Sequence, residues 1–573
     1  MRVTASRRSP FLSLLRRTPL SDRTAWVKKT YHTKGLDPLG VQAPCINLYG
    51  RLLPGITNVT DRARYYSFYP WAVWAFRQLP GSKTLEALIE WIRRADCLFT
   101  MIGIRHRLES GDNDPLRHDK ALVGSFALGP AVAELGRGGR ELLSKYTVRE
   151  DGNPHRYFKN PLGGLKQYYI GTFDGLGLMK SSGRSVAYTN ERGEPMSLAM
   201  DTAVDRKLFA DTVHGDEVTA EHLDALAGFC PCQLLNSSYE HNSLVDLFFD
   251  KASEHGDEGK QRRHTLGLFL DLTRTLPRSE EALGAVLDQH VFRGCAYTGF
   301  FPNGEMWDLP PSLERLRLGW AVYQRNELLS VAVQCIFWVA LQCLEEEPNR
   351  LATTDDFIQW FSASPWVTGA AMDLGSQDFD GLLKLTTSVL PPMGEWQRDE
   401  HEVSLANQAL EAYSEHKKRE VKVELLVHAA RILLTLVARD DNIKPAYGRM
   451  AFPAEYLSLY PINLESLRRL SQSSWSGMAT TTWLAWLAGH WGIEAHLRVA
   501  LRKLRHQSQD TFHVLPTDRG FIVAAMPDPT FTTPRFTQAI QILQDIGAIE
   551  RPPNGEWVKI TSLGEELWSF SRD

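Results

Sequence analysis

The sequence contains little cysteine: seven residues in a chain of 573, scattered over its whole length. A secreted protein held together by disulfides carries more of them, in even number and closer together. We therefore expect a reducing compartment and a cytoplasmic protein. An excess of positive charge is also lacking, because 64 Lys and Arg face 68 Asp and Glu, for a net charge of -4. This balance excludes a uniformly basic nucleic-acid binder but allows local basic patches.

Long hydrophobic runs are absent as well. The most apolar stretch, residues 328–344, is near the lower length limit for a membrane span, and three polar residues interrupt it. Glutamates flank it at both ends. We interpret this stretch as a buried core helix and predict no association with a membrane.

Motifs of known catalytic centres are missing too. The sequence has no phosphate-binding glycine loop and no G-x-S-x-G nucleophile elbow. Glu420-Val-Lys422 has the spacing of a nuclease E-x-K motif, but it lies within a helical pattern instead of a strand. His241-Asn242 has no ββα pattern around it. We therefore predict no catalytic residue and no cofactor, and we favour a protein without enzymatic activity.

Cys230-Pro-Cys232 is a possible half of a metal site. Two cysteines can bind zinc, but the ion needs two further ligands, and no second cysteine pair lies nearby in the sequence. His222, His241 or Cys295 would complete the set only if the fold brought them close. We therefore predict that no metal is bound.

The most distinctive stretch, residues 53–74, reads LPGITNVTDRARYYSFYPWAVW. Its Pro-Gly pair predicts a turn, and the polar residues that follow predict a helix start, with the Asp61 carboxylate facing the first-turn N–H groups. The aromatic rings after it belong in a core or an interface, because each buries a large apolar area. We call residues 53–74 the signature and expect a structural role for its defining residues: Pro54, Gly55, Asp61, Arg62, Arg64, Tyr65, Tyr66 and Trp71.

The signature resembles the start of a family of bacterial proteins that share the pattern pG-(T/I)-x-(T/N)-x-x-x-R-A-R-Y-(F/Y)-x-F-x-P-W. Members of that family tend to be encoded in antiviral defence islands, beside helicases and phospholipase-D-like nucleases. The resemblance covers about twenty residues closely. It implies a role in antiphage defence and a helicase or nuclease as partner. It implies no catalytic residues.

The N-terminal 34 residues form a basic arm with a single acidic residue, Asp22. Such an arm is either solvated or bound to an acidic surface, for example the phosphates of a nucleic acid. The candidate phosphate contacts in it are Arg7, Arg8, Arg16, Arg17, Lys28 and Lys29.

Helical periodicity dominates the rest of the chain and predicts a mainly α protein of several packed helical domains. We expect the basic arm at 1–34, an aromatic-rich helical domain at 35–230, a central helical domain at 231–445 and a C-terminal winged-helix (α+β) module at 446–573. The absence of Gly and Pro from 403–439 predicts one long helix there.

The C-terminal module is predicted from its order of elements: a helix over 533–546, a hairpin over 549–560 that turns at Asn554-Gly555, and a closing helix over 562–570. In a winged helix, the helix before the wing reads DNA bases, and Arg and Gln can contact guanine and adenine edges. The candidate DNA contacts are Arg535, Gln538 and Gln541 of this helix, and Arg498, Arg502, Lys503 and Arg505 on an earlier basic helix face.

These observations lead to a functional hypothesis. We predict a non-catalytic, DNA-binding adaptor of a bacterial antiphage complex, which contacts DNA through the arm and the winged helix and docks a helicase or nuclease. The alternatives are a nuclease whose site is assembled from distant residues, and a scaffold or transcription regulator that acts through protein contacts.

Overall fold

The structure is a computed structural model. It describes residues 36–572, apart from 149–152, 154, 156–157, 159, 184, 278–285, 347–350, 441–459, 508, 519 and 552–556. Of the described residues, 63% are helical and 6% lie in strands, which confirms the prediction of a mainly α protein. The basic arm, 1–34, lies outside the described residues.

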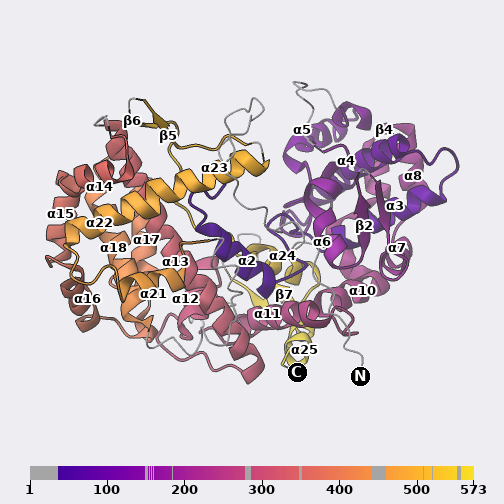
Figure 1. The fold of residues 1–573 in the computed structure, drawn as a ribbon. Helices are drawn as coiled ribbons and strands as arrows, with labels where there is room; N and C mark the ends of the chain where they lie inside the picture. Colours follow the sequence, from indigo (N-terminus) through magenta and orange to yellow (C-terminus); the bar gives the residue numbers. More distant parts are fainter. Residues whose placement is uncertain are drawn as a thin grey trace, which may run out of the picture.

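An N-terminal lobe is formed by the helices on the right of Figure 1. Its helices are α3 (Tyr65–Gln78), α4 (Leu85–Glu109), α5 (Ser125–Leu135), α6 (Ile170–Gly175), α7 (Gly193–Asp201), α8 (Arg206–Gly215), α9 (Ala220–Ala225) and α10 (Ser238–Phe249), with the short turns η1 (Leu143–Tyr146), η2 (Leu165–Tyr169), η3 (Ala227–Phe229) and η4 (Pro231–Asn236). Two small antiparallel ladders lie beside them: β1 (Glu141–Leu142) with β4 (Glu217–Val218), and β2 (Met179–Ser182) with β3 (Ser185–Tyr188).

A second lobe, on the left of Figure 1, is built around the long helix α13 (Pro311–Glu346). Its other helices are α12 (Gln289–Thr298), α14 (Thr354–Ser362), α15 (Pro365–Leu374), α16 (Phe379–Ser388), η5 (Met393–Glu395), α17 (Glu402–Ser414), α18 (Lys422–Ala438), α21 (Leu464–Ser471), α22 (Thr480–Trp486), η6 (Leu487–Glu494) and α23 (Ala495–Gln507). The antiparallel hairpin of β5 (Val514–Thr517) and β6 (Gly520–Val523) packs against α13.

Between the lobes lie elements from both ends of the chain (Figure 1). They are α2 (Gln42–Leu52), α11 (Gly256–Thr275), α24 (Phe536–Asp545), the antiparallel pair β7 (Ile549–Glu550) and β8 (Lys559–Ile560), and α25 (Ser562–Phe570). The predicted helix–hairpin–helix order of the C-terminus is therefore present, although the turn at Asn554-Gly555 lies outside the described residues. Within the predicted module 446–573, α21, α22 and β6 pack against helices of the second lobe.

The apolar stretch at 328–344 lies within α13, as predicted. In the described part of the chain, α13 is the one helix that is long and apolar enough to cross a membrane, and 94% of its most apolar window is buried inside the protein. Helices α12, α17 and α18 pack against it. It is the core helix of the second lobe.

The prediction of one helix over 403–439 is wrong. The chain forms α17 and α18 with a reversal over 415–421, and the two helices pack against each other and against α13. A single straight helix would carry the apolar second half away from that core. Burial of apolar area therefore outweighs the helix propensity of the charged residues between them.

The signature forms the core of the N-terminal lobe. Tyr65, Tyr66 and Trp71 are fully buried in α3, and Trp71 Nε1 donates a hydrogen bond to Asp201 Oδ1 (2.9 Å). The predicted capping role of Asp61 is wrong, because α3 begins at Tyr65 without a side-chain cap. The Asp61 carboxylate instead accepts a hydrogen bond from the C-terminal helix α24.

Asp96 of α4 is a fully buried carboxyl group in the same core. It accepts hydrogen bonds from Tyr69 Oη (2.6 Å) and Gly164 N (2.9 Å), and burial raises its pKa to about 7. The folded chain therefore holds this proton more tightly than the unfolded chain, whose Asp pKa is about 3.9. The contribution to stability is present at low pH and is lost as the pH rises from about 4 to about 7.

Asp96→Asn should remove this pH dependence. We expect the free energy of unfolding of the variant to fall less between pH 4 and pH 8 than that of the wild type, by up to about 4 kcal/mol. Urea unfolding across this range measures the difference. Asp211→Asn, at an exposed ion pair with Lys207, is the control and should follow the wild type. If the free energy of unfolding changed with pH in the same way in the wild type and in Asp96→Asn, the prediction would be contradicted.

Candidate metal centre

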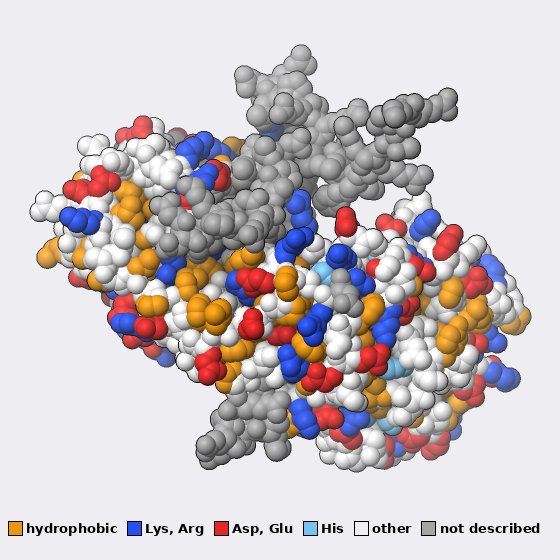
Figure 2. All heavy atoms as spheres, turned by 90° about the horizontal axis from the view of Figure 1, so that it is seen from below, with side chains coloured by type: hydrophobic (Ala, Val, Ile, Leu, Met, Phe, Trp, Pro, Cys, Tyr) orange, Lys and Arg blue, Asp and Glu red, His pale blue; other side chains and the backbone are white. Residues whose placement is uncertain are grey.

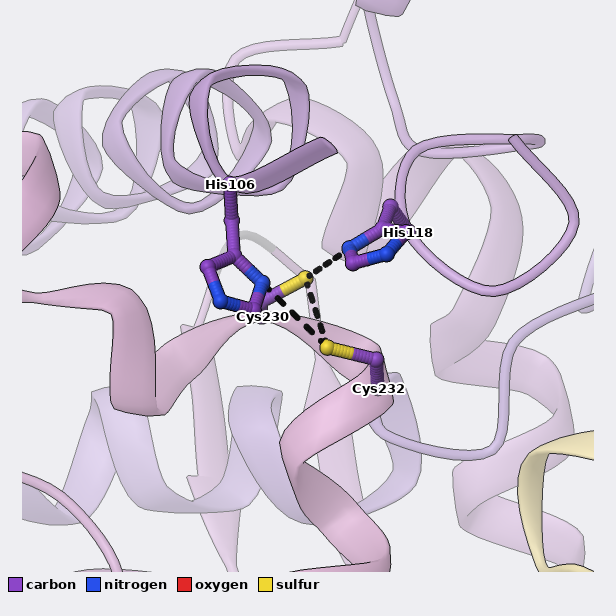
Figure 3. A group of neighbouring side chains, drawn as sticks. All are labelled: His106, His118, Cys230 and Cys232. Carbon is purple, nitrogen blue, oxygen red and sulfur yellow. Dashed lines mark hydrogen bonds between the residues drawn. The ribbon is translucent and has the colours of Figure 1, made fainter. Parts of the chain in front are cut away.

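Four side chains that can bind a metal ion meet in the N-terminal lobe (Figure 3). His106 lies near the end of α4 and His118 in the loop between α4 and α5, while Cys230 and Cys232 lie at the start of η4. Their four potential ligand atoms lie within 4.8 Å of one another. The fold thus brings together two segments that are 112 residues apart in the sequence.

Three distances between donor atoms of this cluster fit a tetrahedral zinc ion. His118 Nδ1 lies 3.3 Å from Cys230 Sγ, His106 Nδ1 lies 3.3 Å from Cys232 Sγ, and the two sulfur atoms are 3.5 Å apart. Zinc bonds of about 2.3 Å to sulfur and about 2.0 Å to nitrogen hold neighbouring donor atoms about 3.3–3.8 Å apart. A disulfide would need about 2.05 Å between the sulfurs. Two thiolates and two imidazoles are a donor set that suits zinc.

The loop that carries His118 is held in place by its own hydrogen bonds. Asp114 Oδ1 accepts from Leu116 N (2.9 Å), and Pro115 O accepts from His118 N (3.2 Å). This is the turn chemistry expected of an Asx-Pro sequence. The imidazole of His118 is therefore fixed relative to the end of α4, where His106 lies.

Arg62 of the signature fixes the same loop from the side of the core. Its guanidinium donates to Arg117 O (3.0 Å) and to Lys120 O (2.9 Å), on either side of His118. Its third hydrogen bond goes to Asp545 Oδ2 of α24 (2.9 Å), and this ion pair is almost fully buried. Planar guanidinium geometry suits such a set of fixed acceptors.

Arg64 of the signature fixes the cysteine segment in a similar way. Its Nη1 donates to Gly228 O (2.6 Å) and Cys230 O (2.5 Å), and its other face forms a two-pronged ion pair with Glu240. Ser67 Oγ also donates to Glu240 (2.6 Å), and all these side chains are fully buried. The two arginines of the signature therefore position the two segments that carry His118, Cys230 and Cys232.

Groups around the cluster orient two of its members. Gln233 Nε2 donates to Cys232 Sγ (3.4 Å). Asp112 Oδ2 lies 3.6 Å from His118 Nε2 and accepts a hydrogen bond from Arg117 (2.6 Å). Carboxylates behind metal-binding histidines fix the ring orientation and increase ligand basicity.

The two thiols differ in their pKa. Interaction with Cys230 and then with His118 lowers the pKa of Cys232, whereas burial raises the pKa of Cys230 well above its ordinary value. Of the two thiols, Cys232 is therefore the one that is deprotonated more readily. A bound cation would stabilise the second.

The predicted base-reading residues of α24 are not on the surface. Gln538 and Gln541 are buried and Arg535 is mostly covered, and all three donate hydrogen bonds to backbone carbonyl groups of the N-terminal segments. These bonds run from Arg535 to Leu53 (2.8 Å), from Gln538 to Asn58 (3.3 Å) and from Gln541 to Leu116 (2.8 Å). The polar face of α24 thus docks on the signature and on the His118 loop, and in this conformation it is not available to DNA.

The four basic residues predicted on one face of α23 differ in their accessibility. Arg498, Arg502 and Arg505 are exposed, and Arg498 forms an ion pair with Glu494. Lys503 instead points to the chain that follows the arm and donates to the carbonyl groups of residues 36 and 37. Three of the four predicted phosphate contacts on this helix therefore remain accessible.

Neither histidine of the cluster is among the residues considered as partners of Cys230 and Cys232. His222, His241 and Cys295, which were considered, are not part of the cluster. The order of the cluster residues, H-x₁₁-H followed by a distant C-x-C, is not a common zinc-finger spacing. The turn cluster between the histidines was the available signal, because it returns the chain to the end of α4.

Comparison with known proteins adds no assignment to this geometry. No protein-family model, curated protein or solved structure matches the chain.

Proposed function

We propose that the protein is a non-catalytic adaptor whose N-terminal lobe is organised by a structural zinc ion and which contacts the phosphates of DNA. The observation that carries this proposal is the composition of the metal centre. Four protein side chains supply all four positions of a tetrahedral ion, whereas catalytic zinc sites keep one position open for water or substrate. His106, His118, Cys230 and Cys232 would hold the ion, and its role would be to fix three segments of the chain.

The proposed DNA contact consists of the exposed arginines of α23 and the basic arm. Lys503 binds the carbonyl groups of residues 36 and 37, so the first described residues after the arm lie against this helix. Elsewhere, Lys and Arg are interspersed with Asp and Glu over the face seen in Figure 2. A mixed surface and a net charge of -4 favour a small, local contact that depends on phosphates and not on bases.

For the C-terminal unit, α24 to α25, we propose a winged-helix-like module that serves docking instead of base reading. Its support is the helix–hairpin–helix order together with the burial of Gln538 and Gln541. This module forms many of its polar contacts with other segments of the same chain. The face that makes none of these contacts is the surface that remains for a partner protein.

The proposed partner is a helicase or nuclease of an antiphage system. This part of the proposal is supported only by the resemblance of the signature to proteins encoded in defence islands. A pull-down with the products of neighbouring genes tests it directly. If the pull-down recovers neither a helicase nor a nuclease, the proposed role of the adaptor in antiphage defence is contradicted.

A salt titration of DNA affinity tests the phosphate contact. Changing Arg498, Arg502 and Arg505 to Gln should reduce the slope of log affinity against log salt by roughly 2–3, because each lost phosphate contact lowers it by about 0.9. Deletion of residues 1–34 should flatten the slope further. The loss of DNA affinity should be the same for different DNA sequences.

The matched control changes two exposed arginines of the N-terminal lobe, Arg137 and Arg140, to Gln, and it should leave the slope unchanged. Absence of DNA binding by the wild type at low salt would refute the phosphate contact. The same protein, incubated with DNA or RNA and Mg²⁺ or Mn²⁺, should cleave neither. Cleavage that survives further purification would replace the adaptor proposal with the nuclease alternative.

A further inference from the structure

A cavity of about 370 Å³ adjoins the metal centre. Its walls come from the His118 loop, η4, the end of α24, β7 and the residues that follow β7 and β8, and they include Arg117, Cys232, Leu235, Ile549 and Arg551. Cavities of this size at a junction of structural units are typical of sites for small molecules.

Arg551 is the unusual residue of this cavity. Its guanidinium is largely buried, which lowers its pKa, yet its hydrogen bonds go to two neutral amides: Nε to Gln544 Oε1 (3.0 Å) and Nη2 to Gln541 Oε1 (2.7 Å). Among the described residues, no carboxylate lies within ion-pair distance of it. Buried charges in proteins are normally paired with a charge of opposite sign.

Asp545, a buried carboxylate that acts on Arg551 electrostatically, already accepts three hydrogen bonds. Its Oδ2 accepts from Arg62 Nε and from Ala63 N (both 2.9 Å), and its Oδ1 accepts from Gln541 Nε2 (2.9 Å). Asp545 and the buried Asp114 both act on Arg551 electrostatically, but neither lies within ion-pair distance of it. An anion that entered the cavity would form the direct ion pair that Arg551 lacks among the described residues.

The other cavity residues agree with an anion that carries an apolar group. Arg117 adds a second guanidinium, half-exposed and paired with Asp112. Leu235 and Ile549 provide an apolar wall. Three lining groups that can carry negative charge oppose an anion: the exposed Glu550, the Asp545 carboxylate, which is paired with Arg62, and the Cys232 thiolate, whose charge zinc would neutralise.

We propose that this cavity binds a small organic anion, with its phosphate or carboxylate group on Arg551 and Arg117 and its apolar part against Leu235 and Ile549. The site goes beyond the proposed adaptor function, and it uses the proposed zinc ion only to neutralise Cys232. Such a ligand would bridge the N-terminal lobe and the C-terminal module.

Isothermal titration of the full-length, zinc-loaded protein with phenyl phosphate, phenylacetate and inorganic phosphate tests this site. We expect saturable binding of phenyl phosphate or phenylacetate, at least tenfold tighter than that of inorganic phosphate. Arg551→Met should weaken it at least tenfold, and Arg551→Lys should restore part of the loss. Arg140→Met, at an exposed site, is the control and should bind as the wild type does.

Leu235→Trp provides a second test that leaves both charges in place. Leu235 is half-exposed at the cavity. The larger side chain of tryptophan should block the apolar wall and weaken the binding of phenyl phosphate more than that of inorganic phosphate. This variant decides the question if Arg551→Met fails to fold. The proposal would be overturned if the zinc-loaded wild type showed no saturable binding of phenyl phosphate or phenylacetate. It would also be overturned if the wild type and Leu235→Trp bound phenyl phosphate with equal affinity. Zinc content measured on the same samples separates this failure from a failure of the metal centre.

Discussion

Cys230→Ala should yield a protein without zinc, whereas the wild type should contain one zinc ion per chain. Structural zinc contributes about 10–16 kcal/mol to the folding of zinc-finger peptides, in which the metal replaces most of a core. Here the lobe also has a core of aromatic residues. We therefore expect the free energy of unfolding to fall by a smaller amount, on the order of 5 kcal/mol. Elemental analysis and thermal unfolding with and without chelator measure both effects.

The matched control for this variant is Cys295→Ala, which removes a buried free thiol of α12 in the second lobe. It should retain the zinc ion, because no metal ligand is changed. Its free energy of unfolding should fall by only about 1 kcal/mol, because only a small buried group is removed. His118→Gln should behave like Cys230→Ala. Wild-type protein without zinc, and without a zinc-dependent shift in melting temperature, would show that the cluster is not a metal centre.

Arg64→Met should have the second largest effect, because it leaves the carboxylate of Glu240 buried without its partner. Breaking a buried ion pair in this way costs about 3–5 kcal/mol. The change also frees the carbonyl groups of Gly228 and Cys230, so zinc affinity should fall together with stability. Denaturant unfolding and competition with a zinc chelator measure the two quantities on one sample.

Two further variants complete this experiment. Arg105→Met removes an arginine that pairs with the half-exposed Asp224, and it should cost at most about 1 kcal/mol. Adding Glu240→Gln to Arg64→Met should recover part of the lost stability, because no buried charge then remains. If Arg64→Met matched Arg105→Met in stability and in zinc affinity, Arg64 would not position the cysteine segment.

The sequence predicts those elements whose signals are local. The apolar periodicity of α13, the order of α24, β7, β8 and α25, and the burial of the aromatic rings in α3 all follow from residues that are neighbours in the chain. Their hydrophobic patterns and turn residues determine them without reference to distant segments.

The errors concern residues that meet partners far away in the sequence. The Arg and Gln side chains of α24 have the polarity of an exposed face, but they are buried against backbone carbonyl groups that periodicity does not reveal. His118 and Cys230 are joined by the tertiary fold alone. The burial of the aromatic rings follows from the sequence of the signature, yet the contacts of Arg62 and Arg64 with the metal-site segments depend on the same distant pairing.

The ion pair between Arg62 and Asp545 has a consequence for the order of events during synthesis, because the two residues are 483 positions apart. At about 5–20 residues per second, a ribosome needs roughly half a minute to a minute and a half to cover that distance. During this time Arg62 and the His118 loop are already made but lack the carboxylate of Asp545 and the amide of Gln541. The N-terminal lobe therefore reaches its final form only after the ribosome has passed α24, and the nascent chain must keep its unfinished core from aggregating until then.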